Sequence, residues 1–113
     1  MKQEFSLTFE LFTRTVEDII TRDELAERLK GKKLLRVKLG IDATAPYLHI
    51  GHAVHLWKIR ALQEAGHKAV IVLGDFTTQI GDPTGKSQTR PVLPFATITK
   101  NIAALKKQIE KIL

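Results

Sequence analysis

Residues 34–73, LLRVKLGIDATAPYLHIGHAVHLWKIRALQEAGHKAVIVL, decide the predicted fold of this chain. Leu34 to Ile41 alternates apolar with polar or small residues, as a strand does when one of its faces is covered; the residues sharing that face are Leu35, Val37, Leu39 and Ile41. Lys68 to Leu73 is a continuous apolar run, which is typical of a strand buried on both faces of a parallel sheet. The sequence therefore predicts two strands separated by the segment between them.

That intervening segment is predicted to be a loop followed by a helix. Residues 42–46 break the alternation and include Pro46, which favours a loop. From Ile50 to Ala65 the periodicity is helical, and Gly66 is expected just past the helix end. One face of this helix carries Val54, Trp57, Ala61 and Ala65. A strand, a helix and a strand in this order indicate a right-handed crossover in an open parallel sheet, which is an α/β fold.

The flanking segments add helices to this unit. The stretch through Ile20 is amphipathic and partly helical, and Thr21 with Glu24 forms a possible capping box for a helix that stops at Gly31. Residues 74–94 read as one long loop, which in a compact domain is more often functional than idle. The last helix carries an apolar stripe made of Ile98, Ile102, Leu105, Ile109 and Ile112. We expect an N-terminal helical segment at 1–33 and the first part of an α/β domain at 34–113.

The predicted elements look like only part of a larger fold. Two strands make a poor sheet, and little in the chain is left to cover the stripe on the last helix. Trp57 and the aromatic residues Phe5, Phe9 and Phe12 are expected in core or lid packing rather than as ligands.

Composition narrows the class of protein. A 43% hydrophobic and 27% charged content is ordinary for a globular protein, and 113 residues suffice for one small domain. No apolar run reaches the roughly 20 residues of a membrane span, and the first residues lack the apolar core of a secretory signal, so we expect a cytoplasmic protein. The absence of cysteine excludes disulfides and thiolate metal sites. A net charge of +6 suggests a polyanionic partner such as ATP or RNA, although solvated helix faces also explain it.

The segment His49-Ile50-Gly51-His52 opens the predicted crossover helix, beyond the end of the first strand. A helix start offers unpaired N–H groups and the positive end of the dipole, and two imidazoles three residues apart can both face an anion bound there. Histidines that donate to a phosphoryl oxygen would stabilise charge developing at phosphorus. Two other interpretations stay open. The pair could be a loop residue and a surface residue, or half of a metal site, with only His55 and His67 nearby.

Two further segments follow strand ends. Gly81 to Ser87 ends like a phosphate-binding P-loop, but Ile80 stands where the first glycine is required, Asp82 adds a negative charge and Pro83 removes a donor. As a turn, this segment leaves the Asp82 carboxylate free to hold an ammonium group or to cap its own turn. Asp42 has the same two interpretations: it caps the loop ahead of Thr44, or it binds substrate.

The run V-K-L-G-I-D-A-T-A-P at 37–46, followed by L-H-I-G-H at 48–52, resembles the first signature of class I aminoacyl-tRNA synthetases. The continuation G-D-F-T at 74–77 and I-G-D-P-T-G-K-S at 80–87 is similar to bacterial tyrosine-tRNA ligases in particular, above all those whose first strand carries V-K-L-G. The resemblance runs from about Leu34 to Pro91 and implies a Rossmann-like nucleotide-binding fold with parallel strands and flanking helices.

By this resemblance the family activates tyrosine with ATP, accompanied by Mg²⁺, and transfers it to tRNA(Tyr). His49 and His52 would stabilise the α-phosphate during attack, and Gly51 would lie beneath the adenine. Asp42 and Thr44 would line the ATP and tyrosine pocket, while Asp82 would hold the tyrosine ammonium. The resemblance implies neither a metal bound by the protein nor association with a membrane. The full-length enzyme would be a homodimer.

The sequence departs from the family pattern in three respects. Lys38 stands where many members have a tyrosine that contacts the substrate phenol, and Ala43 stands where proline is common. Nothing corresponds to the second, lysine-rich signature that serves the departing pyrophosphate, so we expect a truncated catalytic domain with low activity by itself. A ligase for another amino acid such as tryptophan, or a non-catalytic nucleotide- or RNA-binding remnant, remain the alternatives.

Overall fold

A computed structural model describes residues 2–31, 33–80 and 92–113 of the chain. Its elements in chain order are α1 (Lys2–Thr13), α2 (Arg22–Leu29), β1 (Arg36–Asp42), α3 (Ile50–Glu64), β2 (Lys68–Gly74), α4 (Phe76–Ile80) and α5 (Phe95–Ile109). Among the described residues, no helix combines the length and apolar character required to cross a membrane.

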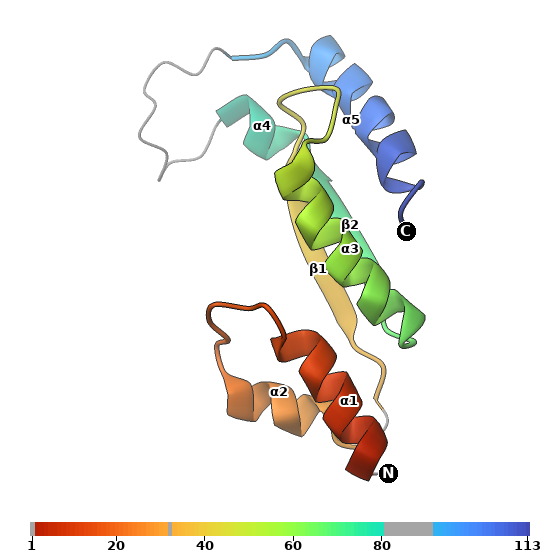
Figure 1. Cartoon of the computed structure of the whole chain (residues 1–113). Coiled ribbons are helices and arrows are strands. Elements are labelled where there is room, and N and C mark those ends of the chain that lie inside the picture. The colour runs from red at the N-terminus through yellow and green to blue at the C-terminus, as the bar shows by residue number, and fades with distance from the viewer. Residues whose placement is uncertain (1, 32, 81–91) are drawn as a thin grey trace.

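The two strands form a parallel sheet, as the sequence predicts. The register pairs Arg36 with Lys68 at one end and Asp42 with Gly74 at the other. Helix α3 makes the crossover and lies along the strands, while α5 lies beside their carboxyl ends (Figure 1). The coarse prediction of an α/β arrangement with parallel strands and flanking helices is therefore confirmed.

The hydrophobic core lies between the sheet and the two long helices. Its buried members are Ile41, Ala43, Leu56, Ile98, Leu105 and Ile109, with Leu39, Ile71 and Leu73 packed against them. The register sets Leu39 beside Ile71 and Ile41 beside Leu73, so these strand residues share one face of the sheet. Burial along β1 alternates in the predicted way, with Val37, Leu39 and Ile41 more buried than the residues between them.

The prediction that β2 is buried on both faces is wrong. Val72 is 46% exposed, because both α3 and α5 contribute to the core on the face that carries Ile71 and Leu73. The expectation that the stripe on α5 has little to cover it is wrong as well. Ile98, Leu105 and Ile109 are buried, and the end of β1 and Leu56 of α3 supply the surface that covers them.

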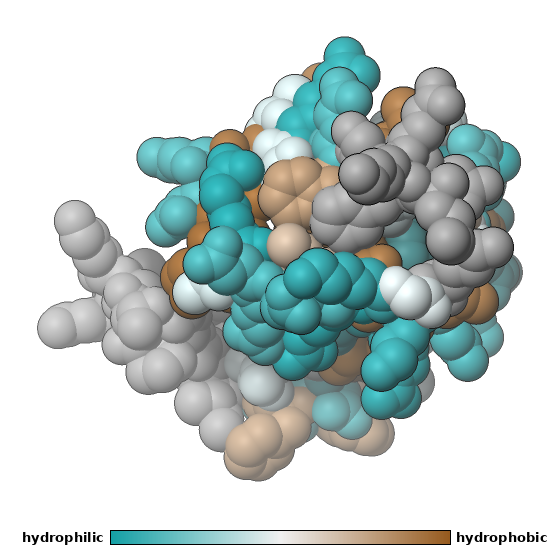
Figure 2. All heavy atoms as spheres, turned by 90° about the horizontal axis from the view of Figure 1, so that it is seen from below, coloured by the Kyte–Doolittle hydropathy of each residue, from teal (hydrophilic) through white to brown (hydrophobic). Residues whose placement is uncertain are grey.

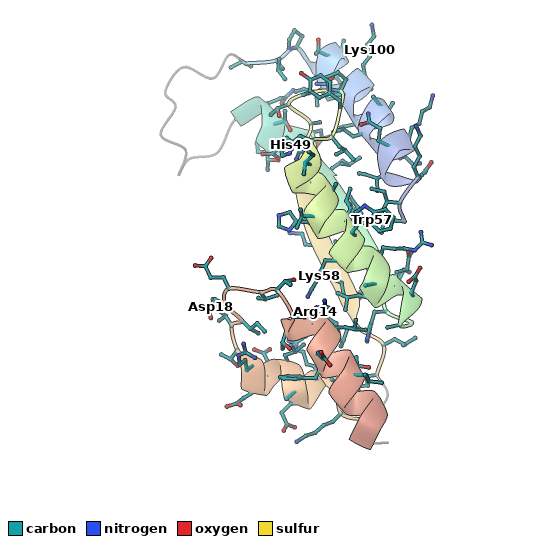
Figure 3. The ribbon with its side chains drawn as sticks, in the orientation of Figure 1. Arg14, Asp18, His49, Trp57, Lys58 and Lys100 are labelled. Atoms are coloured by element: carbon teal, nitrogen blue, oxygen red, sulfur yellow. The ribbon has the colours of Figure 1, made fainter. Side chains whose placement is uncertain are left out.

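The apolar face that carries Val54 and Trp57 is not the buried face of the crossover helix. Trp57 is 60% exposed and Val54 is exposed, whereas the buried residues of α3 are Leu56, Ile59 and Leu62. This helix carries apolar residues on two faces, so periodicity alone did not decide which face meets the sheet. Figure 3 shows Trp57 on the flank of α3, and core packing by this tryptophan is therefore excluded.

Local signals in the sequence are mostly confirmed. Thr21 caps α2 by accepting a hydrogen bond from the Glu24 backbone N–H, but the Glu24 carboxylate pairs with Arg28, so only one half of the predicted capping box forms. Gly66 follows α3 at φ +102°, a conformation that favours glycine. The predicted long loop at 74–94 needs correction, because its first part forms the short helix α4.

Helices α1 and α2 lie at the opposite end of the strands from α4 and α5 (Figure 1). Seen from that end, the surface is mainly hydrophilic, with apolar patches between the polar side chains (Figure 2). Helix α1 packs against α2 and α3. The Phe12 and His67 rings meet edge to face with their centres 5.2 Å apart, and just past the end of α1 Lys58 donates to the Arg14 carbonyl.

Candidate functional site

A cavity of about 430 Å³ lies where β1 ends and α3 begins. Its lining comes from the strand end, the following loop and the first turns of α3, with Leu105 added by α5; the polar lining residues are Asp42, Thr44, Tyr47, His49, His52 and His55. The structure thus brings together four of the predicted site residues, namely Asp42, Thr44, His49 and His52. Asp82 lies outside the described residues, so its predicted role stays a prediction.

His49 and His52 form a reciprocal capping box at the start of α3 (Figure 3 labels His49). The His49 backbone N–H donates to His52 Nδ1 at 3.2 Å, and the His52 backbone N–H donates to His49 Nδ1 at 3.4 Å. The two imidazoles stack, with ring centres 3.8 Å apart and planes 22° from parallel. The two histidines therefore cap the start of α3 together, and neither is simply a loop residue or a surface residue.

This arrangement fixes the tautomer of both rings. A neutral imidazole has one acceptor nitrogen and one donor nitrogen. Since both Nδ1 atoms accept from the backbone, the proton of each neutral ring sits on Nε2. The site thus holds two Nε2–H donors side by side at a helix start, and a phosphoryl oxygen is a fitting acceptor for both.

The environment of His52 favours its neutral form. Burial lowers the pKa of His52 below its ordinary value of 6.5, and the neighbouring imidazoles of His49 and His55 lower it further because two positive charges at this distance repel. A neutral ring still donates through Nε2. It can therefore stabilise an anion without first having to be protonated.

Gly51 is required by the position of the His49 ring. A Cβ at residue 51 would lie 2.8 Å from His49 Cε1, closer than real contacts allow, and 3.0 Å from His49 Nδ1. In this structure the open space above Gly51 is therefore taken by the His49 imidazole. The sequence prediction assigned that space to a nucleotide, and Gly51 itself is not among the residues that line the cavity.

Asp42 accepts a hydrogen bond from the Thr77 hydroxyl at 2.7 Å, which links the end of β1 to α4. Gly74 makes this bond possible, because a Cβ there would collide with Thr77 Oγ1 and lie 2.7 Å from Asp42 Oδ1. The carboxylate is exposed, and among the described residues only Thr77 bonds to it. Sequence reasoning quoted Thr77 as part of G-D-F-T but gave it no role; its position just after a strand end was the available signal.

Three other polar side chains hold the loop between β1 and α3, and sequence reasoning missed all of them. Thr78 Oγ1 accepts from the Ala43 N–H, Asn101 donates to the Ala43 carbonyl, and Gln108 bonds to Pro46 and Leu48. The signal for the two amides was available, since Asn101 and Gln108 interrupt the apolar stripe of α5 on its buried side.

His67, one of the two other histidines considered as metal ligands, contacts other parts of the protein. It is buried, its Nδ1 accepts from the Leu35 N–H at 3.0 Å, and its ring contacts Phe12. Within residues 2–31, 33–80 and 92–113, no three His, Cys, Asp or Glu side chains gather in a way that could hold a metal ion.

Comparison with known proteins places the chain in a family of translation enzymes. Residues 29–113 match the family described as tRNA synthetases class I (W and Y), and the chain belongs to this family. Among curated relatives, the tyrosine--tRNA ligase of Thermotoga maritima is 47% identical over 103 residues, covering 91% of this chain and 26% of its own length. The tyrosine--tRNA ligases of Carboxydothermus hydrogenoformans and Idiomarina loihiensis are each 46% identical, covering 97% and 100% of the chain and 28% of their own lengths. The chain thus spans about a quarter of the length of the curated relatives it matches.

Proposed function

We propose that this chain forms the first part of the Rossmann-like catalytic domain of a tyrosine-tRNA ligase. Residues 34–113 would belong to that domain, and residues 1–33 would form a helical segment ahead of it. The enzyme would activate tyrosine with ATP, giving tyrosyl-adenylate and pyrophosphate, and then transfer tyrosine to tRNA(Tyr). It would act in the cytoplasm as a homodimer.

The observation that carries this proposal is the reciprocal pairing of His49 and His52 beside the cavity. The pairing uses both Nδ1 atoms and the N–H groups of residues 49 and 52, and leaves Ile50 and Gly51 as N–H donors in the first turn of α3. A phosphate is then favoured at the start of α3. Two Nε2–H groups, two backbone N–H groups and the positive end of the helix dipole would all stabilise it there.

The proposed step is attack of a tyrosine carboxylate oxygen on the α-phosphorus of ATP. A new oxygen–phosphorus bond forms, the bond from the α-phosphorus to the bridging oxygen breaks, and pyrophosphate leaves with that oxygen. Negative charge on the α-phosphoryl oxygens grows during attack, so the fixed donors of His49 and His52 would stabilise the transition state more than bound ATP. Mg²⁺ would enter with the phosphates and offset part of their charge.

The remaining assignments concern the rims of the cavity. Asp42 and Thr44 would contact ATP and tyrosine, because both are exposed side chains in the lining. Gly51 would lie close to the adenine, and Asp82 would hold the tyrosine ammonium. The excess of positive charge on the chain, +6, suits ATP and tRNA as partners.

The test is tyrosine-dependent exchange of labelled pyrophosphate into ATP by the complete gene product that contains residues 1–113. Replacing both histidines (His49→Ala with His52→Ala) should lower the exchange rate by about a hundredfold or more, since each lost donor to developing charge typically costs that order. Gln63→Ala is the control, because Gln63 is an exposed residue of the same helix that does not line the cavity, and it should change the rate by less than threefold. Unchanged exchange in the double variant would show the assigned role to be wrong.

A second variant separates the site from the fold. Gly51→Ala should change the free energy of unfolding by less than about 1 kcal/mol, because the better helix propensity of alanine offsets the loss of the His49 cap. It should nevertheless lower exchange by about tenfold or more, because the new Cβ displaces the His49 ring. Exchange at the wild-type rate in this variant would mean that the observed position of the ring is not the active one.

A ligase for tryptophan is the second candidate, because the matched family covers both amino acids. The same exchange assay decides between them. Exchange that depends on tryptophan and not on tyrosine would replace the proposal, although the curated relatives reported above are named as tyrosine ligases.

A further inference from the structure

The loop that joins β1 to α3 has little regular structure, yet it carries Thr44 and delivers His49 to the cavity. Its backbone therefore needs partners from elsewhere, since buried N–H and C=O groups are costly when unpaired. The structure supplies them from α4 and α5, which lie more than 30 residues further along the chain. The hydrogen bonds fall at the two ends of the loop, at Ala43 and at residues 46–48.

At the first end, Ala43 is fully buried and both of its backbone polar groups are satisfied by side chains. Thr78 Oγ1 accepts from the Ala43 N–H at 2.9 Å, and Asn101 Nδ2 donates to the Ala43 carbonyl at 2.9 Å. Asn101 is itself only 5% exposed. The point at which the chain leaves β1 is thus fixed by two different helices.

At the second end, one side-chain amide holds the backbone on both sides of Tyr47. Gln108 Oε1 accepts from the Leu48 N–H at 2.9 Å, and Gln108 Nε2 donates to the Pro46 carbonyl at 2.7 Å. The same Nε2 donates to the Ala104 carbonyl at 3.1 Å, which orients the amide on its own helix. Leu48 directly precedes His49, so this amide sets the path of the chain into the capping box.

Asn101 and Gln108 are seven residues apart, two turns of α5, and share its buried side with Ile98, Leu105 and Ile109. The apolar residues seat α5 on the core, and the two amides bond to the loop. Neither amide is among the residues that line the cavity. Their influence on any ligand there must pass through the loop.

We propose that Asn101 and Gln108 are positioning residues of the active site, which hold the two ends of the β1–α3 loop so that Thr44 and His49 face the cavity in one fixed arrangement. This inference rests on the proposed function where it concerns catalysis. Its structural part, control of the His49–His52 pair by Gln108, can be measured independently of activity.

The test uses Gln108, which is half-buried. When Gln108 is replaced, the Leu48 N–H and the Pro46 carbonyl can bond to water instead. An Asn101 variant would leave the buried Ala43 carbonyl unpaired, which would destabilise the fold. Gln108→Met keeps the length of the side chain and removes every hydrogen bond. Gln108→Glu keeps an acceptor for the Leu48 N–H but loses donation to the Pro46 carbonyl. Lys107→Met is the matched control, because it makes a similar change at an exposed position of the same helix.

In the complete gene product, Gln108→Met should lower kcat for pyrophosphate exchange by about tenfold while KM for tyrosine stays within twofold, because orientation of the donors matters most in the transition state. Gln108→Glu should fall between Gln108→Met and the wild type, and Lys107→Met should match the wild type. A KM change without a kcat change would overturn the catalytic part of the proposal.

The second readout is nuclear magnetic resonance of the imidazole nitrogens in the same proteins. The wild type should show Nε2–H tautomers at His49 and His52, and Gln108→Met should show mixed tautomers and a His52 titration closer to its ordinary range. Unchanged imidazole signals in Gln108→Met would overturn the proposal, whatever happens to kcat. If the wild type shows neither tyrosine- nor tryptophan-dependent exchange, the proposed function fails, and the imidazole signals alone decide whether Gln108 positions the pair.

Discussion

The two ends of this molecule are built in different ways. At the cavity, the hydrogen bonds that fix the loop join residues 35, 58, 60 and 62 positions apart. At the opposite end, the polar contacts of α2 join residues three or four positions apart: the Thr21 cap and the exposed pairs Glu24–Arg28 and Glu27–Lys30. The loop at the cavity depends on the fold of the whole chain, whereas these polar contacts of α2 follow from local sequence.

The candidate site lies at the end of the molecule that depends on long-range contacts. Local contacts make helices, but the candidate site needs a strand end, a helix start and α5 to meet at one place. The contacts of the N-terminal helices with that unit include the pair Lys58–Arg14 and the pair Phe12–His67. Figure 3 shows Arg14 and Lys58 between α1 and α3, away from His49 at the far end of α3.

The largest expected effect is a difference in the free energy of unfolding between substitutions at the two ends. Leu105→Ala should lower the free energy of unfolding by about 3 kcal/mol, because it opens a cavity in a core that α5 shares with β1 and α3. Leu7→Ala in α1 should lower it by less than about 1 kcal/mol, because Leu7 is 58% exposed. Urea unfolding followed by circular dichroism measures both values. A loss at Leu7 equal to that at Leu105 would contradict the comparison.

The next effect concerns a single hydroxyl at the cavity end. Thr78→Val keeps the shape of the side chain but leaves the buried Ala43 N–H unpaired, so we expect a loss of about 2 kcal/mol. Thr99→Val is the control, because Thr99 is exposed and its hydroxyl bonds to the Phe95 carbonyl in its own helix. It should change the free energy of unfolding by less than about 0.5 kcal/mol. Equal losses would mean that the contact between Thr78 and Ala43 adds nothing specific.

A smaller effect is expected at the opposite end. Thr21→Ala removes the N-cap of α2 and should cost about 1 kcal/mol, and Thr21→Ser should restore most of it because it keeps the oxygen. Amide chemical shifts should change in α2 and leave His49 and His52 unaffected. Changes that reached the capping box would show that the two ends are coupled.

The smallest expected effect is a response to acid. Burial lowers the pKa of His67, so the unfolded chain binds the extra proton first as the pH falls below the ordinary value of 6.5. Stability should therefore be full above that value, decline as the pH falls past it, and level off below the lowered pKa. His52 should contribute in the same direction, because its pKa is lowered as well.

The measurement is the free energy of unfolding between pH 8 and pH 5. Protonation of Nδ1 also removes the acceptor for the Leu35 N–H, so the Leu35 amide signal should shift along with the His67 titration. His67→Gln offers an acceptor that does not titrate and should weaken the pH dependence. A pH profile in His67→Gln identical to that of the wild type would rule out a contribution from His67.

The elements that the sequence predicted best are those with one dominant periodicity or one strong cap. The alternation in β1, the stripe on α5, the cap at Thr21 and the glycine after α3 were all readable in advance. The face of α3 was not, because two of its faces are apolar and only contact with the sheet selects one. Helix α4 was missed because it is short and lies in a segment rich in turn residues.

For the candidate site, the sequence by itself determined which residues would stand at the end of β1 and at the start of α3. Chain order and the parallel crossover bring Asp42, Thr44, His49 and His52 to the same edge of the sheet, because ligand-facing loops follow strand ends in such folds. Only the tertiary structure decided how they are held. The stacking of the two rings, the bond between Thr77 and Asp42 and the amides of Asn101 and Gln108 depend on distances between elements far apart in the chain, which no local pattern specifies.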